Sequence, residues 1–425
     1  MNALEKESVM KKISLFLLIA LVFCMTLYPF QKQESLDGRW RAVWETSGGE
    51  VPLPLFIKID ASGEINAEVH NGFEVIRFDR VIKKENHIDF FIDRYECVIS
   101  VDLAEDGKSM KGTWSKQTGR PNQTPFIAVK GNMERFPADT YKPLAGKAPI
   151  QDISGKWRLR FDEDEWDSVG IFKQEGDNVE GTIRAIDGDF HFLKGVYRNG
   201  LLLVSYFNGS WVFLFRAEMD KTGKLHGYWA RGPKKPYPWT AVKDEDADLV
   251  DCFSLTKLSN KEGLFRFKYP LSEDPDRMIS NSDPEFQGKP LLVGITMNGC
   301  PNAHDSAALL SELYEQYCGR GLNIVCIHTE MMKDIPRIQS RIAAFKKAYG
   351  IQFPIVFSTA ETKKEFNQEI SDLKRFIAWP TVIFIGRDGK VDTIHTGFDS
   401  KATGEYYTKL VKKYRAIIER LLKRE

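Results

Sequence analysis

The chain has 425 residues, of which 42% are hydrophobic and 28% are charged. Its 60 lysine and arginine residues nearly balance its 59 aspartate and glutamate residues, and the resulting net charge of +1 argues against a nucleic-acid partner. This length predicts several domains, and the composition is ordinary for a soluble globular protein.

The chain begins with a segment that is typical of an export signal. Lys11 and Lys12 precede an apolar run over residues 13–28, which is short for a membrane span of roughly 20 residues. Residues 1–30 therefore predict either a signal peptide or an N-terminal membrane anchor, and lipidation of Cys24 is a third alternative. In each case we expect an exported protein of the periplasm or cell envelope, with no contact to the membrane beyond this segment.

Six cysteines are spread through the chain, without a Cys-x-x-Cys pair or a Cys/His cluster at metal-ligand spacing. The sequence therefore predicts neither a disulfide scaffold nor a metal site, and we expect no cofactor. Cys97 and Cys326 lie in predicted strands, where a small buried hydrophobic residue is the simpler interpretation.

The first half of the chain contains an internal repeat. Residues 36–44 (LDGRWRAVW) are echoed by residues 153–161 (ISGKWRLRF), at an offset of 117. Two more pairs follow in the same order: residues 112–114 (GTW) with 227–229 (GYW), and residues 128–130 (AVK) with 241–243 (AVK). Three anchors in order at a nearly constant offset indicate a tandem duplication.

Both copies consist of short, alternating apolar segments separated by turn residues, with no helical period. This pattern predicts two tandem all-β domains, each a small antiparallel barrel or sandwich, over residues 31–135 and 151–246. The proline-rich residues 136–150 are predicted to link them. Core packing is a simpler role than a ligand pocket for five of their tryptophans: Trp40, Trp44, Trp157, Trp166 and Trp211.

Strands and helices alternate in the C-terminal part, residues 253–425. The predicted strands cover residues 291–297, 322–328, 353–357, 382–385 and 391–396. The predicted helices cover residues 301–317, 337–349, 361–376 and 404–422. An Asp-Gly turn at residues 388–389 joins the last two strands. This order predicts an α/β domain with a mixed sheet and helices on both faces.

Cys300 lies at the junction between the first of these strands and its following helix. Unpaired backbone N–H groups at a helix start favour a thiolate, so we expect the pKa of Cys300 to lie below the ordinary value of about 8.5. His304 and Asp305 follow in the first turn of the helix. We expect both to be exposed there, with a possible role in tuning the thiol.

Residues 253–425 resemble the TlpA/ResA type of thioredoxin-like disulfide reductases of the bacterial envelope. The resemblance rests on motifs at these positions: 288–290 (GKP), 299–302 (GCPN), 379–381 (WPT) and 386–389 (GRDG). It implies a thioredoxin-like fold with Cys300 as the catalytic nucleophile. It also implies that Trp379 and Pro380 position an extended substrate, with Pro380 in the cis form that only X-Pro bonds adopt at low cost.

The chain departs from this family where a second cysteine is expected. Ala303 stands at that position, and Ser306 replaces an acidic residue that many members carry. In a dithiol enzyme the second cysteine resolves the mixed disulfide formed by the first. Without it, an external thiol has to resolve the intermediate.

Two functions follow as alternatives. The first is a monothiol thiol–disulfide oxidoreductase that acts through Cys300 on disulfide-bearing or thiol-bearing envelope proteins. The second is a redox-inactive binding protein, whose β-domains recognise a partner or ligand. A one-cysteine peroxidase is disfavoured, because Met297 stands where that site expects a hydroxyl residue.

Overall fold

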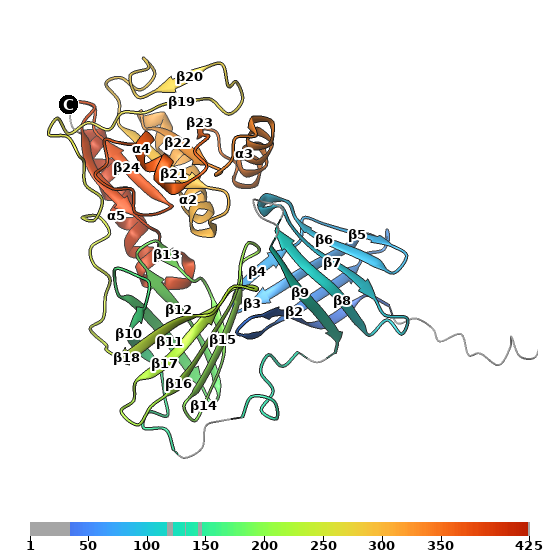
Figure 1. The fold of residues 1–425 in the computed structure, drawn as a ribbon. Helices are drawn as coiled ribbons and strands as arrows, with labels where there is room; N and C mark the ends of the chain where they lie inside the picture. Colours follow the sequence, from blue (N-terminus) through green and yellow to red (C-terminus); the bar gives the residue numbers. More distant parts are fainter. Residues whose placement is uncertain (1–34, 117–121, 132, 143–146, 424–425) are drawn as a thin grey trace, which may run out of the picture.

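The computed structural model describes residues 35–116, 122–131, 133–142 and 147–423. The segment predicted as a signal or anchor, residues 1–30, lies outside the described residues. Two nine-stranded β-sheets precede a C-terminal α/β domain (Figure 1). Within the described ranges, no helix is long and apolar enough to cross a membrane.

The first sheet is an open, antiparallel half-barrel with the spatial order β4-β3-β2-β1-β9-β8-β7-β6-β5. Its strands are β1 (Gly38–Thr46), β2 (Gly49–Ile59), β3 (Ile65–Asn71), β4 (Glu74–Arg77), β5 (Arg80–Lys84), β6 (His87–Ile92), β7 (Cys97–Leu103), β8 (Ser109–Lys116) and β9 (Asn122–Lys130).

The second sheet is a closed antiparallel barrel, because β11 pairs with both β10 and β12. Its strands are β10 (Gly155–Phe161), β11 (Ser168–Glu175), β12 (Asn178–Ala185), β13 (Gly188–Asp189), β14 (Leu193–Arg198), β15 (Leu201–Phe207), β16 (Val212–Met219), β17 (Leu225–Ala230) and β18 (Tyr237–Lys243). Eight of these strands close the barrel, and the short β13 pairs only with β12.

The strands of the two sheets correspond one to one, β1–β9 with β10–β18. In each copy the first strand pairs with the second and with the last. In each copy a buried tryptophan of the first strand donates its indole N–H to the carbonyl four residues earlier, Trp40 to Leu36 at 3.0 Å and Trp157 to Ile153 at 2.8 Å. These two tryptophans are fully buried and fill the cores of their sheets.

A glycine recurs at the same place in both copies because two backbones approach closely there. A Cβ atom on Gly112 would lie 2.0 Å from the carbonyl oxygen of Ser100, and one on Gly227 would lie 2.1 Å from that of Arg216. Real Cβ atoms never come so close, so the glycine of the repeated motif is required by strand packing.

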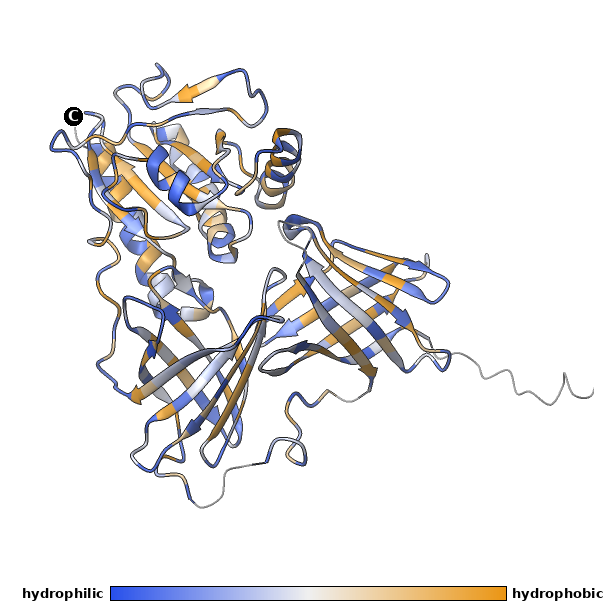
Figure 2. Cartoon of the chain, in the orientation of Figure 1, coloured by the Kyte–Doolittle hydropathy of each residue, from blue (hydrophilic) through white to orange (hydrophobic). Residues whose placement is uncertain are grey.

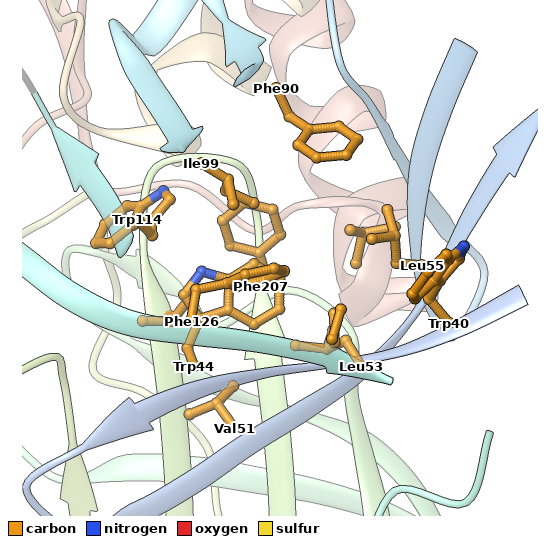
Figure 3. Close-up of a cluster of buried hydrophobic side chains, with 14 of the residues drawn as sticks. Trp40, Trp44, Val51, Leu53, Leu55, Phe90, Ile99, Trp114, Phe126 and Phe207 are labelled. Carbon is orange, nitrogen blue, oxygen red and sulfur yellow. The ribbon is translucent and has the colours of Figure 1, made fainter. Parts of the chain in front are cut away.

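Strand β15 belongs to the cores of both sheets. Leu202, Val204 and Tyr206 point into the closed barrel, whereas Leu201, Leu203 and Phe207 pack into the half-barrel. Figure 3 shows Phe207 beside Trp44 and Phe126 of the first sheet. The two sheets therefore share one continuous apolar contact, and all seven residues of β15 are buried.

The C-terminal domain contains a mixed sheet of the order β23-β22-β21-β24-β25. Its strands are β21 (Leu291–Met297), β22 (Asn323–Thr329), β23 (Ile355–Ser358), β24 (Thr381–Ile385) and β25 (Val391–Thr396), and its helices are α2 (Pro301–Tyr317), α3 (Ile335–Tyr349), α4 (Lys363–Glu369) and α5 (Glu405–Lys423). A small hairpin, β19 (Lys268–Pro270) and β20 (Met278–Ser280), precedes them.

Both faces of this sheet are covered. Helices α2, α3 and α5 form the core on one face, whereas α4 and residues 265–286 cover the other. The strands of this sheet are largely apolar, whereas polar and apolar residues alternate along many strands of the two β-sheets (Figure 2). The predicted fold class is confirmed: two all-β units, one of them a closed barrel, precede a thioredoxin-like α/β domain.

One predicted element was too long. The helix expected over residues 361–376 ends at Glu369, because the residues after it pair with the segment that leads into the domain. Leu373 forms a β-bridge with Leu258, and Asp372 accepts the backbone N–H of Arg266 at 2.8 Å. Tertiary contacts therefore compete successfully with helix propensity here.

Candidate active site around Cys300

Cys300 stands immediately before α2, after the turn of residues 298–299 that follows β21. Its backbone is extended, with φ −109° and ψ 109°, and Pro301 occupies the first turn of the helix. Proline suits this position because its ring presets φ and its missing N–H would have no partner there. The Cys300 N–H donates to the Met297 carbonyl at 3.2 Å and closes the turn.

Residues 379–380 form the opposite wall of the site. The Trp379-Pro380 peptide bond is cis. The Cys300 thiol donates to the Trp379 carbonyl at 3.5 Å, and the Pro380 carbonyl accepts the N–H of Gly397 at 2.8 Å. The structure therefore brings together the three residues to which the sequence assigned the nucleophile and the positioning of substrate.

The expected low pKa of Cys300 is wrong for this structure. Burial raises the pKa of the thiol to about 12. The backbone N–H groups of Asn302 and Ala303 lower it, as a helix start should, but the negative charges of Asp187 and Asp305 act with burial. The helix start does lower the pKa of Cys300, but desolvation raises it by more.

Ala303 and Ser306 lie in the first two turns of α2 and are fully enclosed. Ala303 is 0% exposed, and its N–H donates to the Cys300 carbonyl at 3.0 Å. The hydroxyl of Ser306 is buried and has no hydrogen-bond partner among the described residues. The side chain one helical turn from Cys300 is thus the buried methyl group of Ala303 and not a second thiol.

His304 is buried, contrary to the expectation of an exposed first-turn residue. Its Nε2 lies 2.7 Å from the Asn298 carbonyl and therefore carries the proton, so Nδ1 accepts the hydroxyl of Tyr349 at 2.9 Å. Burial holds the pKa of His304 well below its usual range. The neutral ring fixes the turn before Cys300 and stacks on Tyr95 of the first sheet, with centroids 4.6 Å apart.

Asp305 is partly enclosed rather than exposed, with 40% of its side chain accessible. It lies 3.4 Å from His191 Nε2 of the barrel, whose Nδ1 lies 3.2 Å from Glu74 of the first sheet. Burial lowers the pKa of His191, but the two carboxylates outweigh it and raise the value to about 10. A charged histidine thus joins all three units beside the site.

The β-sheets contribute Lys116 and Ser210, which the sequence analysis missed, and Trp211, which it assigned to core packing. Both Ser210 Oγ and Trp211 Nε1 donate to the Gly299 carbonyl, at 3.2 and 3.1 Å. Lys116 is 7% exposed, donates to Ser210 Oγ at 2.6 Å and lies 4.2 Å from the ring centroid of Trp211. One signal was available: Trp211 has no tryptophan at the equivalent position of the first copy.

The remaining described cysteines form no disulfide with Cys300. Cys97 and Cys326 are buried and Cys318 is exposed, and no disulfide joins the described cysteines. Within the described ranges, no group of three or more His, Cys, Asp or Glu side chains could hold a metal ion.

Comparison with known proteins identifies the C-terminal part. Residues 265–410 match the protein family described as Redoxin. The thiol-disulfide oxidoreductase ResA of Bacillus subtilis (strain 168) is 24% identical over 158 residues, which cover 37% of this chain and 79% of that protein.

Two solved structures are each similar to part of the chain. One is a thioredoxin-family thiol:disulfide interchange protein from Chlorobium tepidum TLS, 20% identical over 38% of this chain and 95% of its own, with a TM-score of 0.28. The other is a thiol-disulfide oxidoreductase from Bacteroides fragilis NCTC 9343, 16% identical over 36% and 99%, with a TM-score of 0.27. Residues 265–410 of this chain thus match the Redoxin family, and the chain is similar in sequence to a thiol–disulfide oxidoreductase. We refer to the C-terminal α/β domain that contains these residues as the redoxin domain.

Proposed function

We propose that this protein is an exported thioredoxin-like thiol–disulfide oxidoreductase of the TlpA type, which works as a monothiol through Cys300. One observation carries the proposal: the Cys300 thiol stands at the start of α2, 3.5 Å from the carbonyl of Trp379, with the cis residue Pro380 next to it. The similarity to ResA supports the reaction class.

The chemistry follows from having one thiol. The Cys300 thiolate attacks one sulfur of a substrate disulfide, whose S–S bond breaks as the mixed disulfide forms. The displaced thiolate takes up a proton. A second, external thiol then attacks the mixed disulfide, releases Cys300 and forms a new disulfide with the substrate, because Ala303 cannot supply the resolving sulfur. The substrates would be disulfide-bearing or thiol-bearing proteins of the cell envelope.

A redox-inactive binding protein is the second candidate, and a specific observation favours it. Residues of both β-sheets cover the start of α2, and burial raises the pKa of Cys300 to about 12, so the thiol is protonated in this arrangement. In that case the β-sheets would recognise the partner and Cys300 would be a structural residue.

Trapping of mixed disulfides separates the two candidates. Because Ala303 cannot resolve an intermediate, the wild-type protein should accumulate adducts through Cys300 when it is exposed to envelope extract. Two-dimensional gels that are reducing in the second dimension would show them. Cys300→Ser should abolish the adducts, whereas Cys318→Ser, which removes an exposed thiol at the end of α2, should leave them unchanged.

Restoring the family pattern provides the complementary test. Ala303→Cys places a thiol one helical turn from Cys300, so the adducts should be released and insulin-type disulfide reduction should appear. Absence of adducts in the wild type, together with no reductase activity in Ala303→Cys, would refute the oxidoreductase and favour the binding protein.

A further inference from the structure

A segment of the barrel lies between the two walls of the Cys300 site, with Asn302 on one side and Pro380 on the other, and the space between these walls is called the Cys300 groove. Residues 186–189 comprise the turn after β12 and the short strand β13. At one wall of the groove, the side chain of Asn302 donates to the Asp189 carbonyl at 2.9 Å. A Cβ atom on Gly188 would lie only 2.4 Å from the same asparagine side chain, so only glycine fits this contact.

The same segment touches the opposite wall. A Cβ atom on Gly397 would lie 2.1 Å from the carbonyl oxygen of Ile186, so the two backbones are in contact there. Gly397 is also the residue whose N–H donates to the Pro380 carbonyl. The segment therefore spans from the Pro380 side to the Asn302 side, and Asp187 between them is close enough to Cys300 to act on the thiol electrostatically.

Buried hydrogen bonds fix this segment to the redoxin domain. Asp189 is 4% exposed, and its carboxylate accepts the backbone N–H of Ser400 at 2.6 Å and the Ser400 hydroxyl at 2.7 Å. It also accepts the backbone N–H of His191 at 2.9 Å. These bonds hold the segment in one position over the groove.

Equivalent turns of the two sheets meet the domain around this groove. The β15–β16 turn contacts the Gly299 carbonyl through Trp211, and the equivalent β6–β7 turn contacts His304 through Tyr95. Next to Tyr95, Glu96 pairs with Arg337 of α3 at 2.6 Å. The duplication thus supplies two related contacts to one end of the redoxin domain.

Ion pairs lie at the rim of the contact between the barrel and the redoxin domain. Arg184 of β12 forms a bidentate pair with Asp399, at 2.7 and 3.1 Å, and its guanidinium lies over the ring of Tyr406 at 3.6 Å. On the other side, Arg375 pairs with Glu165 at 2.7 Å. The Arg375–Glu165 pair is exposed on both sides and separates at little cost, whereas the Arg184 pair is largely buried and holds the two units together more strongly.

From these contacts we infer that residues 186–189 are a built-in plug of the Cys300 groove. The redoxin domain must separate from the barrel before a protein disulfide can reach the thiol, and the rim ion pairs set how often this occurs. The inference concerns access to Cys300 and does not depend on whether the thiol turns over.

Selective labelling of cysteines tests the plug in the full chain. The rate of alkylation of Cys300 by iodoacetamide is measured by mass mapping at pH 8, with the exposed Cys318 as the internal reference. The double variant Arg184→Gln/Arg375→Gln removes the arginine charge of both rim ion pairs. It should raise the rate at Cys300 about tenfold or more while Cys318 stays unchanged.

Arg320→Gln is the matched control, because it removes a bidentate ion pair with Glu419 that lies wholly inside the redoxin domain. It should leave both rates unchanged. If the double variant does not fold, the wild type in increasing NaCl replaces it, and the ratio of Cys300 to Cys318 labelling should rise with salt as the rim pairs are screened.

The plug is overturned if the ratio of Cys300 to Cys318 labelling is unchanged in the folded double variant. If that variant does not fold, an unchanged ratio in the salt series overturns it. A ratio that rises in a protein that forms no mixed disulfides would refute the exchange reaction and leave the plug standing. The two proposals therefore fail on different measurements.

Discussion

Two opposing electrostatic effects act on the pKa of the Cys300 thiol. Two backbone N–H groups at the start of α2 favour its thiolate, whereas burial and the charge of Asp187 disfavour it. Removing water from a charged sulfur costs more than two partial charges return, so the thiol stays protonated. The barrel supplies Asp187, so the reactivity of Cys300 depends in part on the interface.

Cys300 in the wild type should therefore react more slowly than an ordinary thiol. A thiol of pKa about 12 has about 3000-fold less thiolate at neutral pH than one of pKa about 8.5, and the more basic thiolate regains about 30-fold through its nucleophilicity. We expect alkylation about 100-fold slower than at an ordinary exposed thiol, with a rate that still rises at pH 10. Labelling at pH 7 as fast as at Cys318 would show that the helix terminus dominates.

A buried histidine of β25 predicts how stability depends on pH. His395 bonds the Tyr414 hydroxyl at 2.8 Å, and burial lowers its pKa to about 3. The unfolded chain binds this proton near pH 6.5 and the folded chain does not, so stability is lost as pH falls from about 6.5 towards 3, by about 1.4 kcal/mol per pH unit.

His395→Gln removes this term and keeps a hydrogen-bonding group near Tyr414. Urea unfolding of the two proteins between pH 7 and pH 4 should give stabilities that converge as pH falls. Parallel curves would show that His395 is not buried in its neutral form.

At the scale of one element, β15 is the strand that packs into the cores of both β-sheets. Leu202, Val204 and Tyr206 face one core, and Leu203 and Phe207 face the other. A strand with both faces buried favours apolar residues on both faces, and six of the seven residues of β15 are apolar or aromatic, with Ser205 as the exception.

Truncation of Phe207 should destabilise both sheets together. Its side chain is 0% exposed and stacks on Trp44 with ring centroids 4.8 Å apart. Phe207→Ala should reduce the free energy of unfolding by about 3–5 kcal/mol in urea titrations. Val242→Ala is the control in the same barrel, because Val242 is 42% exposed, and its effect should stay within about 0.5 kcal/mol. A similar loss in both variants would mean that Phe207 does not fill the shared core.

At the scale of the whole molecule, Arg135 joins the two sheets just before the predicted linker. Its guanidinium donates to the His70 carbonyl at 3.1 Å in the first sheet. In the barrel it donates to the Lys194 carbonyl at 3.2 Å and to Ser205 Oγ at 3.1 Å. Together with the shared core, these bonds predict that the two sheets unfold as one cooperative unit.

Arg135→Met tests this coupling, since it keeps the aliphatic length and removes the donors. The carbonyls and hydroxyl left behind should cost about 2 kcal/mol or more. We expect calorimetry of the wild type to show one transition for both sheets, and the variant to show a lower or split transition. An unchanged single transition would assign the coupling to the apolar contact alone.

Much of the fold could be predicted from sequence patterns that recur along the chain. The three-anchor duplication predicted two β-units, and the alternation of strands and helices predicted the α/β domain. Cys300, Trp379 and Pro380 stand in short motifs at element boundaries, so the family resemblance pointed to them, and the structure places them side by side.

The sequence by itself determined which chemistry is available: one thiol at a helix start, Ala303 where a second would be needed, and an X-Pro bond opposite. Only the tertiary structure decided the state of that thiol. The environment of the thiol depends on residues far away in the chain, because the barrel residue Asp187 acts on Cys300 by its charge and Trp211 bonds the carbonyl of the preceding Gly299. No local pattern around Cys300 records a contact between domains, so the burial that raises its pKa could not be predicted from sequence.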